Sequence, residues 1–194
     1  MRATAMRVIA GAAHGRRIAA PRGLTTRPAT ARVRSSIFSR LAARIDLEGA
    51  RVLDLFAGSG SLGLEALSRG AASVVFVDLA RAAAAAIQRN LETFGFAARA
   101  RVLVMDMPRA IERLAGERAQ FDLVFIDAPY ADDSSASVLA ALTAAELFAA
   151  GGIAVVRQDR RAPALEPSHL ELVNQATVGD HRIALYRRPL ASPN

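Results

Sequence analysis

The stretch Asp54-Leu55-Phe56-Ala57-Gly58-Ser59-Gly60-Ser61-Leu62-Gly63 decides the fold of this chain. It follows an apolar run and leads into helix-forming residues, so it predicts a strand, a tight glycine turn and the beginning of a helix. Gly58 and Gly60 can adopt backbone angles that other residues rarely adopt, and without side chains they let a ligand lie directly against the main chain. The stretch therefore predicts a nucleotide-like cofactor at the turn.

The glycine spacing by itself fits two kinds of cofactor. Gly58, Gly60 and Gly63 satisfy the dinucleotide fingerprint, and Asp78 follows about 20 residues after the first glycine, where an acid would meet a ribose. Asp54, however, stands at the end of the predicted strand, where a carboxylate would repel a pyrophosphate and attract a cation. S-adenosylmethionine carries a sulfonium and an ammonium group, so Asp54 favours this cofactor over a nicotinamide dinucleotide.

A second motif, Asp127-Ala128-Pro129-Tyr130, directly follows the apolar run 121–126. This places it at the carboxyl end of another strand, the edge where open α/β sheets carry their chemistry. Methyl transfer to an exocyclic amine needs acceptors that align the nitrogen with the methyl carbon. Asp127 offers a carboxylate and Ala128 a carbonyl, whose direction Pro129 restricts. Tyr130 can stack on a base that is extruded or single-stranded.

The composition suits one domain that works in the cytoplasm without a metal. The chain has 194 residues, of which 52% are hydrophobic, and this is enough for one core. It has neither the apolar run of roughly 18 residues that a membrane span needs nor the pattern of a signal peptide. Cysteine is absent and the three histidines lack the close spacing of metal ligands, so we expect no disulfide and no metal site.

Positive charge is concentrated near the amino terminus. Residues 1–45 contain ten arginines and no acid, whereas the whole chain has a net charge of +7. A basic segment of this kind binds phosphate backbones. A compositional preference for arginine would explain why the chain has no lysine, but it would not explain the missing acids. We therefore expect an RNA-binding arm, with contacts from Arg7, Arg16, Arg17, Arg27, Arg32 and Arg34.

From residue 50 onward, strand-like apolar runs alternate with helical stretches. The expected strands are 51–56, 73–77, 101–105, 121–126 and 152–156, and the expected helices are 80–94, 108–114 and 137–149. This βαβ rhythm predicts an α/β fold with a doubly wound, mostly parallel sheet. Residues 170–177 and 182–187 are two more β-like runs with no helix between them, and they predict an antiparallel hairpin.

The chain is expected to divide into two parts. Residues 1–49 would form the basic arm and a helix that contact RNA, and residues 50–194 the cofactor-binding domain. Within the first part, residues 8–20 predict a short β-like arm and residues 30–45 a helix with arginines on its polar face. Prolines and a glycine break the path between them.

Three blocks of sequence resemble one family. They are Arg7-Val8-Ile9-Ala10-Gly11 with Gly15-Arg16, then Arg27-Pro28-Ala29-Thr30 with Arg32-Val33-Arg34 and Phe38, then residues 54–60 with 62–70. The chain resembles the RsmD-type family of bacterial methyltransferases, which modify N2 of a guanine in small-subunit ribosomal RNA. The third block is typical of S-adenosylmethionine enzymes, and the two amino-terminal blocks make the resemblance specific.

The resemblance implies a class I methyltransferase that uses S-adenosylmethionine and acts on 16S ribosomal RNA in a small subunit or an assembly intermediate. It assigns the methionine part of the cofactor to Asp54 and the glycine turn, the ribose to Asp78, and the adenine to Asp106 with Met107. The implied cofactor-binding set is Asp54, Phe56, Ala57, Gly58, Ser59, Gly60, Asp78, Leu79, Asp106 and Met107, and the implied catalytic set is Asp127, Ala128, Pro129 and Tyr130. The chain departs from the family at Ala128, where the motif has a proline, so we expect a less rigid carbonyl there.

Three other functions remain open at this point. The acid-x-Pro-Tyr motif would equally serve adenine N6 in DNA, although the amino-terminal blocks argue against that target. A nicotinamide-dependent oxidoreductase would use the same glycine fingerprint, but Asp54 disfavours it. A catalytically silent RNA-binding protein would explain both the basic arm and Ala128.

Overall fold

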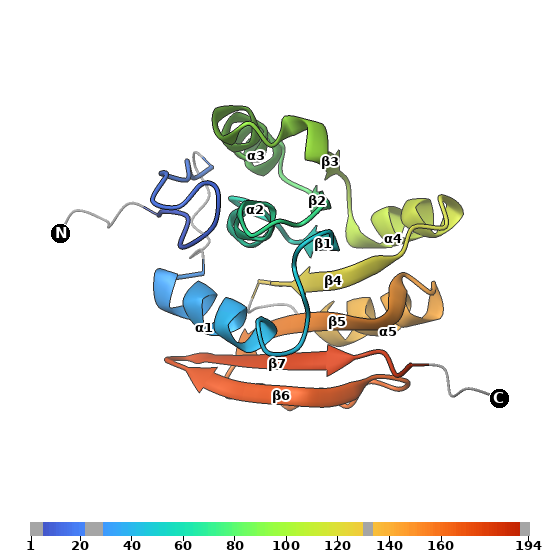
Figure 1. Cartoon of the computed structure of the whole chain (residues 1–194). Coiled ribbons are helices and arrows are strands. Elements are labelled where there is room, and N and C mark those ends of the chain that lie inside the picture. The colour runs from blue at the N-terminus through green and yellow to red at the C-terminus, as the bar shows by residue number, and fades with distance from the viewer. Residues whose placement is uncertain (1–5, 22–28, 130–133, 191–194) are drawn as a thin grey trace.

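A computed structural model of the chain describes residues 6–21, 29–129 and 134–190, and Figure 1 shows their arrangement. Within these residues the strands form one seven-stranded sheet in the order β3-β2-β1-β4-β5-β7-β6. Strands β1 to β5 are parallel, and β7 lies antiparallel between β5 and β6. Their bounds are β1 Arg51–Leu55, β2 Ser73–Asp78, β3 Ala100–Val104, β4 Phe121–Ile126, β5 Phe148–Asp159, β6 Glu171–Val178 and β7 His181–Arg187. The predicted doubly wound sheet and carboxyl-terminal hairpin are confirmed.

Helices cover both faces of the sheet, as the near-continuous apolar runs of its central strands require. Helices α1, α2 and α3 pack on one face, and α4 and α5 on the other (Figure 1). Their bounds are α1 Ala31–Leu41, α2 Ser61–Ser68, α3 Arg81–Phe94, α4 Met107–Gly116 and α5 Ser134–Ala144, with a short 3₁₀ helix at Ala97–Arg99. No helix in the described ranges is long and apolar enough to cross a membrane.

The predicted helix over residues 137–149 and strand over 152–156 have wrong boundaries. Helix α5 ends at Ala144, and Glu146 then adopts a left-handed φ of 53°, which turns the chain. Strand β5 already begins at Phe148 and pairs there with Phe121, and the register shifts before Ile153 pairs with Leu123. The glycines at 151 and 152 therefore mark an irregularity inside the strand and not its beginning.

The amino-terminal helix is shorter than the predicted 30–45 and is packed into the core. Thr30 caps α1 by accepting a hydrogen bond from the Val33 amide at 3.3 Å, and the helix ends at Leu41. The ring of Phe38 lies 5.8 Å from that of Phe125 on β4. Helix α1 therefore covers the sheet beside α2.

Residues 8–20 form the expected β-like arm only in part, because the segment folds back on itself with antiparallel main-chain hydrogen bonds, such as that from the Val8 amide to the Arg16 carbonyl at 3.0 Å, but contains no full strand. An isolated antiparallel β-bridge between Arg7 and Arg17 closes this fold-back. Val8, Ala13 and Ile18 are nevertheless buried in the core cluster that contains α2. Side chains of α2 and α3 form hydrogen bonds with the main chain of this arm.

Candidate active site

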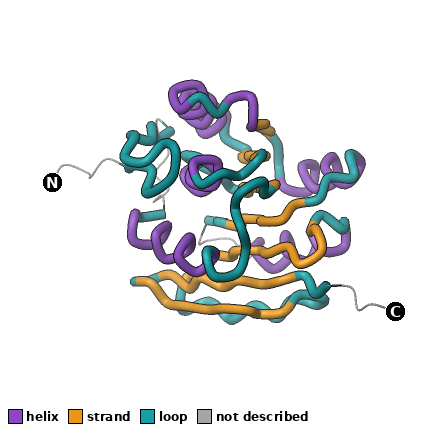
Figure 2. The backbone as a smooth tube through the Cα atoms, in the orientation of Figure 1, coloured by secondary structure: helices purple, strands orange, loops and turns teal. Residues whose placement is uncertain are grey.

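The carboxyl ends of β1 and β4 lie side by side at the centre of the sheet. The chain leaves β1 for α2 on one face and leaves β4 for α5 on the other (Figure 2). The point at which the crossovers diverge is where open α/β sheets bind their ligands. Asp54, Asp78 and Asp127 lie at this edge, at the ends of β1, β2 and β4.

The glycine turn after β1 has the conformation that its sequence predicts. Gly58 and Gly60 have φ angles of 54° and 73°, in the left-handed region, and Gly60 caps α2. Gly63 is needed for a different reason, which is steric: a Cβ at this position would lie 2.4 Å from the ring of Phe76 on β2. Gly58 and Gly60 therefore shape the turn, and Gly63 lets α2 approach the sheet. Phe56 also has a positive φ, 56°, so the chain turns sharply as it leaves the strand.

Asp54 is a buried carboxylate held by the main chain of α2. It is 1% exposed, and its Oδ2 accepts a hydrogen bond from the Gly63 amide at 2.9 Å. Burial raises the pKa of Asp54 well above its ordinary value, the bond from Gly63 opposes this shift, and the charges of Asp127 and Asp78 add to it. A cation brought to this position would stabilise the ionised carboxylate, which is the property expected of a site for a sulfonium and an ammonium group.

Asp78 joins the end of β2 to the glycine turn. Its Oδ2 accepts from the Gly58 amide and its Oδ1 from the Ala80 amide, both at 2.8 Å. A carboxylate has about four lone-pair sites, so both bonds leave capacity for ribose hydroxyls. Leu79 beside it is 70% exposed, and its apolar side chain stands at the same edge.

Asp106 and Met107 lie just after β3, the neighbour of β2. The structure of helix α4, which begins here, accounts for most of their contacts. Asp106 caps α4, because its Oδ1 accepts from the Arg109 amide at 2.9 Å. Met107 is 8% exposed and packs in the core cluster under α4. Their assignment to the adenine stays a prediction.

Asp127 is the second acid at the centre of this edge, and its partner comes from β5. Its carboxylate Oδ1 forms an ion pair with Nε of Arg157, and the two side chains are 15% and 8% exposed. Burial raises the pKa of Asp127, and the charges of Arg157 and His181 oppose that rise. Ala128 is buried and Pro129 exposed. Tyr130 lies outside the described residues.

Arg157 is absent from the residues expected from the sequence. Its position offers one signal, since it directly follows the apolar run 152–156 of a strand that is buried along most of its length. A charged residue in such a place needs a partner, but the sequence does not say which acid is near it.

The arginines of the amino-terminal segment fall into two groups. Arg7, Arg16, Arg17 and Arg32 are exposed, as an RNA contact requires, and Arg27 lies outside the described residues. Arg16 also lies over the ring of Phe94, 5.0 Å from its centroid.

Arg34 differs from the expectation of an RNA contact. It is 1% exposed, and it donates to the main-chain carbonyls of Ala29 at 3.0 Å and Arg7 at 2.5 Å. It lies on the inner face of α1 with Ile37, Phe38 and Leu41, at helical spacing. Its guanidinium therefore joins the arm to α1, and the prediction that Arg34 contacts RNA is wrong, because the side chain is buried.

Buried polar side chains of α2 hold the arm in place. The carboxylate of Glu65 is fully buried and accepts from the amides of Ile9 at 2.7 Å and Ala10 at 3.0 Å. Ser68 Oγ accepts from the Ala13 amide at 2.9 Å.

Asn90 of α3 connects the same arm to the glycine turn. Its amide group exchanges two hydrogen bonds with the main chain of Ala19, at 2.8 and 3.0 Å, and donates to the Ser59 carbonyl at 3.3 Å. The amino-terminal segment is thus docked beside the cofactor turn, although none of these contacts is visible as a sequence motif.

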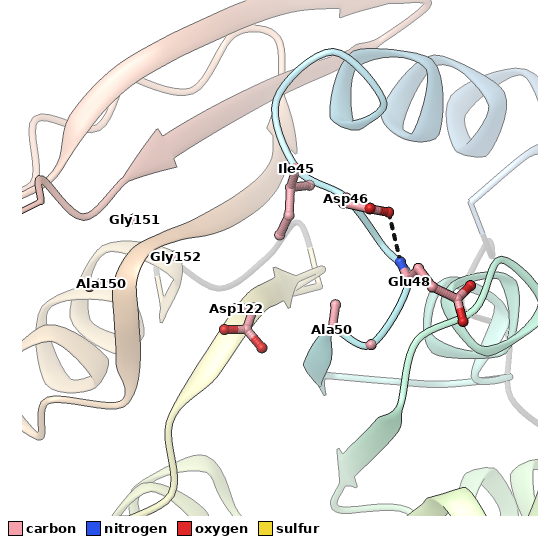
Figure 3. Close-up of a pocket in the computed structure, with 9 residues that line it drawn as sticks. Ile45, Asp46, Glu48, Ala50, Asp122, Ala150, Gly151 and Gly152 are labelled. Atoms are coloured by element: carbon pink, nitrogen blue, oxygen red, sulfur yellow. Dashed lines mark hydrogen bonds between the residues drawn. The ribbon is translucent and has the colours of Figure 1, made fainter.

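A cavity of about 280 Å³ lies at the opposite end of the strands. Figure 3 shows Asp122 and Ala50 beside it, together with Ile45, Asp46 and Glu48 from the segment that leads into β1. It adjoins the amino ends of β1 and β4 and is therefore remote from the aspartates described above. The candidate site is the carboxyl edge and not this cavity.

The strand order, the glycine turn after β1 and the acids at the strand ends define a class I methyltransferase fold. A solved structure titled "Putative methyltransferase yhhF from Escherichia coli" superposes with a TM-score of 0.81 and 33% identity, over 96% of this chain and 99% of that one. The family model described as "Conserved hypothetical protein 95" matches residues 6–187, and the chain belongs to this family, the RsmD family.

Two relatives cover almost the same length. "Putative rRNA methyltransferase YlbH" of Bacillus subtilis is 35% identical over 94% of this chain and 99% of its own length. "Ribosomal RNA small subunit methyltransferase D" of Haemophilus influenzae is 28% identical over 94% of this chain and 93% of its own length. The membership in the RsmD-type family that the sequence motifs predict is confirmed.

Proposed function

We propose that this protein transfers a methyl group from S-adenosylmethionine to the exocyclic N2 of a guanine in 16S ribosomal RNA. The observation that carries the proposal is the placement of two acids, the buried Asp54 and the largely buried Asp127, at the ends of adjacent parallel strands. One suits a cationic cofactor and the other an amine. The small-subunit RNA methyltransferase of H. influenzae and the rRNA methyltransferase of B. subtilis support the choice of RNA.

The residues of the cofactor side fit S-adenosylmethionine. Asp54 is a buried carboxyl group that accepts a hydrogen bond from a main-chain amide, and burial disfavours its ionised form, so a ligand cation would stabilise the carboxylate there. Space is open beside Gly58, where an added Cβ would come no closer than 3.9 Å to another heavy atom. Asp78 would accept from the ribose hydroxyls, and the exposed side chain of Leu79 would cover an apolar face of the adenosine.

The residues of the target side fit an amine. Asp127 and the Ala128 carbonyl would accept the two N–H groups of guanine N2 and direct its lone pair at the methyl carbon. When bound, the cofactor supplies a methyl group that is already activated by its sulfonium. With the amine held by Asp127 and the Ala128 carbonyl, the N–C bond would form as the C–S bond breaks, the electron pair would go to sulfur, and the nitrogen would release a proton to solvent.

The exposed arginines of the amino-terminal segment would hold the RNA. Arg7, Arg16 and Arg17 lie on the segment that Asn90 joins to the glycine turn, and Arg32 lies on α1. Phosphates bound there would lie on the same side of the molecule as the cofactor.

The test is methyl transfer from labelled S-adenosylmethionine to small ribosomal subunits from cells that lack the protein, followed by mapping of the modified nucleotide. We expect label on one guanine N2 of 16S RNA, with naked 16S RNA run in parallel to identify the preferred substrate. Asp127→Ala serves as the control enzyme. Label on adenine in DNA, or cofactor binding without transfer to any small-subunit RNA, would overturn the proposal.

A further inference from the structure

The ion pair between Asp127 and Arg157 is built into the centre of the sheet. Ile126, the last residue of β4, pairs with Val156 of β5, so Asp127 and Arg157 are the next residues along two neighbouring parallel strands. Residues in this relation project to the same face of a sheet. Arg157 is paired with Ile183 of β7, and the preceding Val156 with Ile126 of β4, so strands on both sides hold the main chain at this point.

The guanidinium engages one carboxylate oxygen, Oδ1. This leaves Oδ2 as the oxygen for an amine, and it restrains rotation of the carboxylate, because a charged hydrogen bond to one oxygen favours one orientation of the group. The side chains are 8% and 15% exposed, so little water reaches the pair. A carboxylate without this partner could rotate about its terminal torsion, which has broad minima.

The charge of Arg157 also keeps the buried acid in the useful protonation state. Burial favours protonated Asp127, and a protonated carboxyl would present an O–H donor to an amine that needs an acceptor. The charge of His181 of β7 also favours ionised Asp127, and the charge of Asp127 in turn opposes the ionisation of Asp54 on β1. Arg157 is the cation in direct contact with it.

We propose that Arg157 is a positioning residue for methyl transfer, which holds the Asp127 carboxylate ionised and oriented so that its second oxygen accepts the target amine. This inference rests on the proposed function of Asp127. Arg157 itself touches neither the base nor the cofactor in this arrangement. Its effect on methyl transfer is therefore expected to pass through Asp127.

The first experiment compares Arg157→Gln with Arg157→Lys on small ribosomal subunits. We expect Arg157→Gln to lower kcat about 10- to 100-fold, the scale of a misaligned reactant, with little change in KM for the subunits or in cofactor affinity by calorimetry. The acidic limb of the activity profile moves to higher pH in this variant. Arg157→Lys keeps the charge without the guanidinium Nε–H that contacts Oδ1, so it restores the pH limb and only part of kcat. His181 and Asp54 are present in both variants, so their contributions cancel in the comparison.

Arg51→Gln is the matched control, because Arg51 pairs with Asp122 at the other end of β4. It should leave kcat and the pH profile unchanged. If Arg157→Gln does not fold, the kcat and pH profile of Arg157→Lys still decide the question.

A double-mutant cycle separates positioning from a merely structural role. Asp127→Asn retains an acceptor oxygen that needs no counter-ion, so adding Arg157→Gln to it should have less effect on kcat than the same change has beside Asp127. Equal effects in both backgrounds, or wild-type kcat and pH profile in folded Arg157→Gln, would overturn the inference while the wild-type enzyme remains active. Absence of transfer by the wild-type protein would instead overturn the proposed function, and the inference with it.

Discussion

Strand β4 carries an aspartate–arginine pair near each end, and the surroundings of the two pairs differ. Near the amino end, Asp122 contacts Arg51 of β1 at 3.1 Å, and the side chains are 32% and 48% exposed. At the carboxyl end, Asp127 contacts Arg157 of β5, and the side chains are 15% and 8% exposed. The residue types are the same, but only the second pair is largely removed from water.

The difference in burial reverses the direction of the pKa shift. Burial raises the pKa of Asp122, but the hydrogen bonds from Arg51 outweigh it, so its pKa is lowered. At Asp127 burial outweighs Arg157 and His181, so its pKa is raised. Desolvation therefore decides whether an arginine partner merely stabilises an ionised acid or prepares it for chemistry. We expect chemistry at one end of β4 and a small contribution to stability at the other.

The largest effect is expected from removing the acid at the carboxyl end. Asp127→Ala should lower methyl transfer about 10²-fold or more, because the target nitrogen loses the group that aligns it. Cofactor binding should be almost unchanged, since Asp54 and the glycine turn are intact. Initial rates with small ribosomal subunits and calorimetry with S-adenosylmethionine measure the two properties separately.

Asp122→Ala is the control for that substitution, because it removes an aspartate from the same strand. Its methyl transfer should equal that of the wild-type protein. Near-normal turnover of Asp127→Ala would exclude Asp127 from the mechanism, and equal losses in both variants would mean that the strand itself had been disturbed.

The next effect tests Asp54, which differs from Asp127 in having a main-chain partner in place of an arginine. Asp54→Asn keeps an acceptor for the Gly63 amide but loses the negative charge. We expect cofactor affinity to weaken about tenfold or more, since a hydrogen bond or ion pair to a charged group contributes about 1.5–3 kcal/mol. Calorimetry measures this loss, and unchanged affinity would contradict the assignment of Asp54 to the cofactor.

The same variant changes how stability depends on pH. The folded protein holds a proton on Asp54 at pH values where the unfolded chain has released it, because burial raises the pKa of Asp54. The free energy of unfolding therefore falls as pH rises from the ordinary pKa of an aspartate through the raised one. Asp54→Asn should reduce this fall, and urea unfolding without cofactor at acid and neutral pH would show it. A wild-type pH dependence in the variant would mean that Asp54 is not the titrating group.

Much of the cofactor side could be predicted because its parts are close in the sequence. Asp54, Gly58, Gly60 and Gly63 lie within ten residues, and each has a conformation or contact that its residue type explains. The strand order likewise follows from the alternation of strands and helices. The glycine turn and the strand order could therefore be predicted from spacings between residues that are close in the sequence.

The pairing of Asp127 with Arg157 could not be predicted in the same way. The two residues are 30 positions apart, and their contact depends on a register that includes an irregularity before Ile153. The docking of Ile9 on Glu65 spans 56 positions. Nothing in local periodicity specifies such contacts.

Arg34 is a different case, since its burial could have been recognised. It shares a stripe with Ile37, Phe38 and Leu41, at the spacing of one helix face. The basic composition of the segment suggested that Arg34 is exposed and binds RNA. The apolar stripe indicates instead that Arg34 lies on the buried face of α1. The exposed arginines of the arm remain candidates for RNA.

The third effect is a loss of RNA affinity on substitution of those arginines. For each residue it should be smaller than the effects expected at Asp127 and Asp54. Replacing Arg16, Arg17 and Arg32 by glutamine should weaken RNA binding and flatten its salt dependence by up to about 0.7 log units for each phosphate that the variant no longer binds. Binding measured over a series of salt concentrations gives the slope, with Arg113→Gln on α4 as the control, because it is exposed and paired with Glu117. Cofactor affinity should not change, since Asn90 and its hydrogen bonds with Ala19 and Ser59 are retained. An unchanged slope would place the RNA surface elsewhere.

The smallest effect is expected at the amino end of β4. Arg51→Gln should lower the free energy of unfolding by about 0.2–1 kcal/mol, because an exposed ion pair contributes little in water, and added salt should reduce the difference. The folded-state pKa of Asp122 is lowered, so the contribution of the pair is present above the ordinary pKa of an aspartate and disappears as pH falls through the lowered one. Urea unfolding at neutral and acid pH, with and without salt, measures this. A destabilisation as large in acid as at neutral pH, or any decrease in methyl transfer, would show that the two ends of β4 do not differ as their exposure indicates.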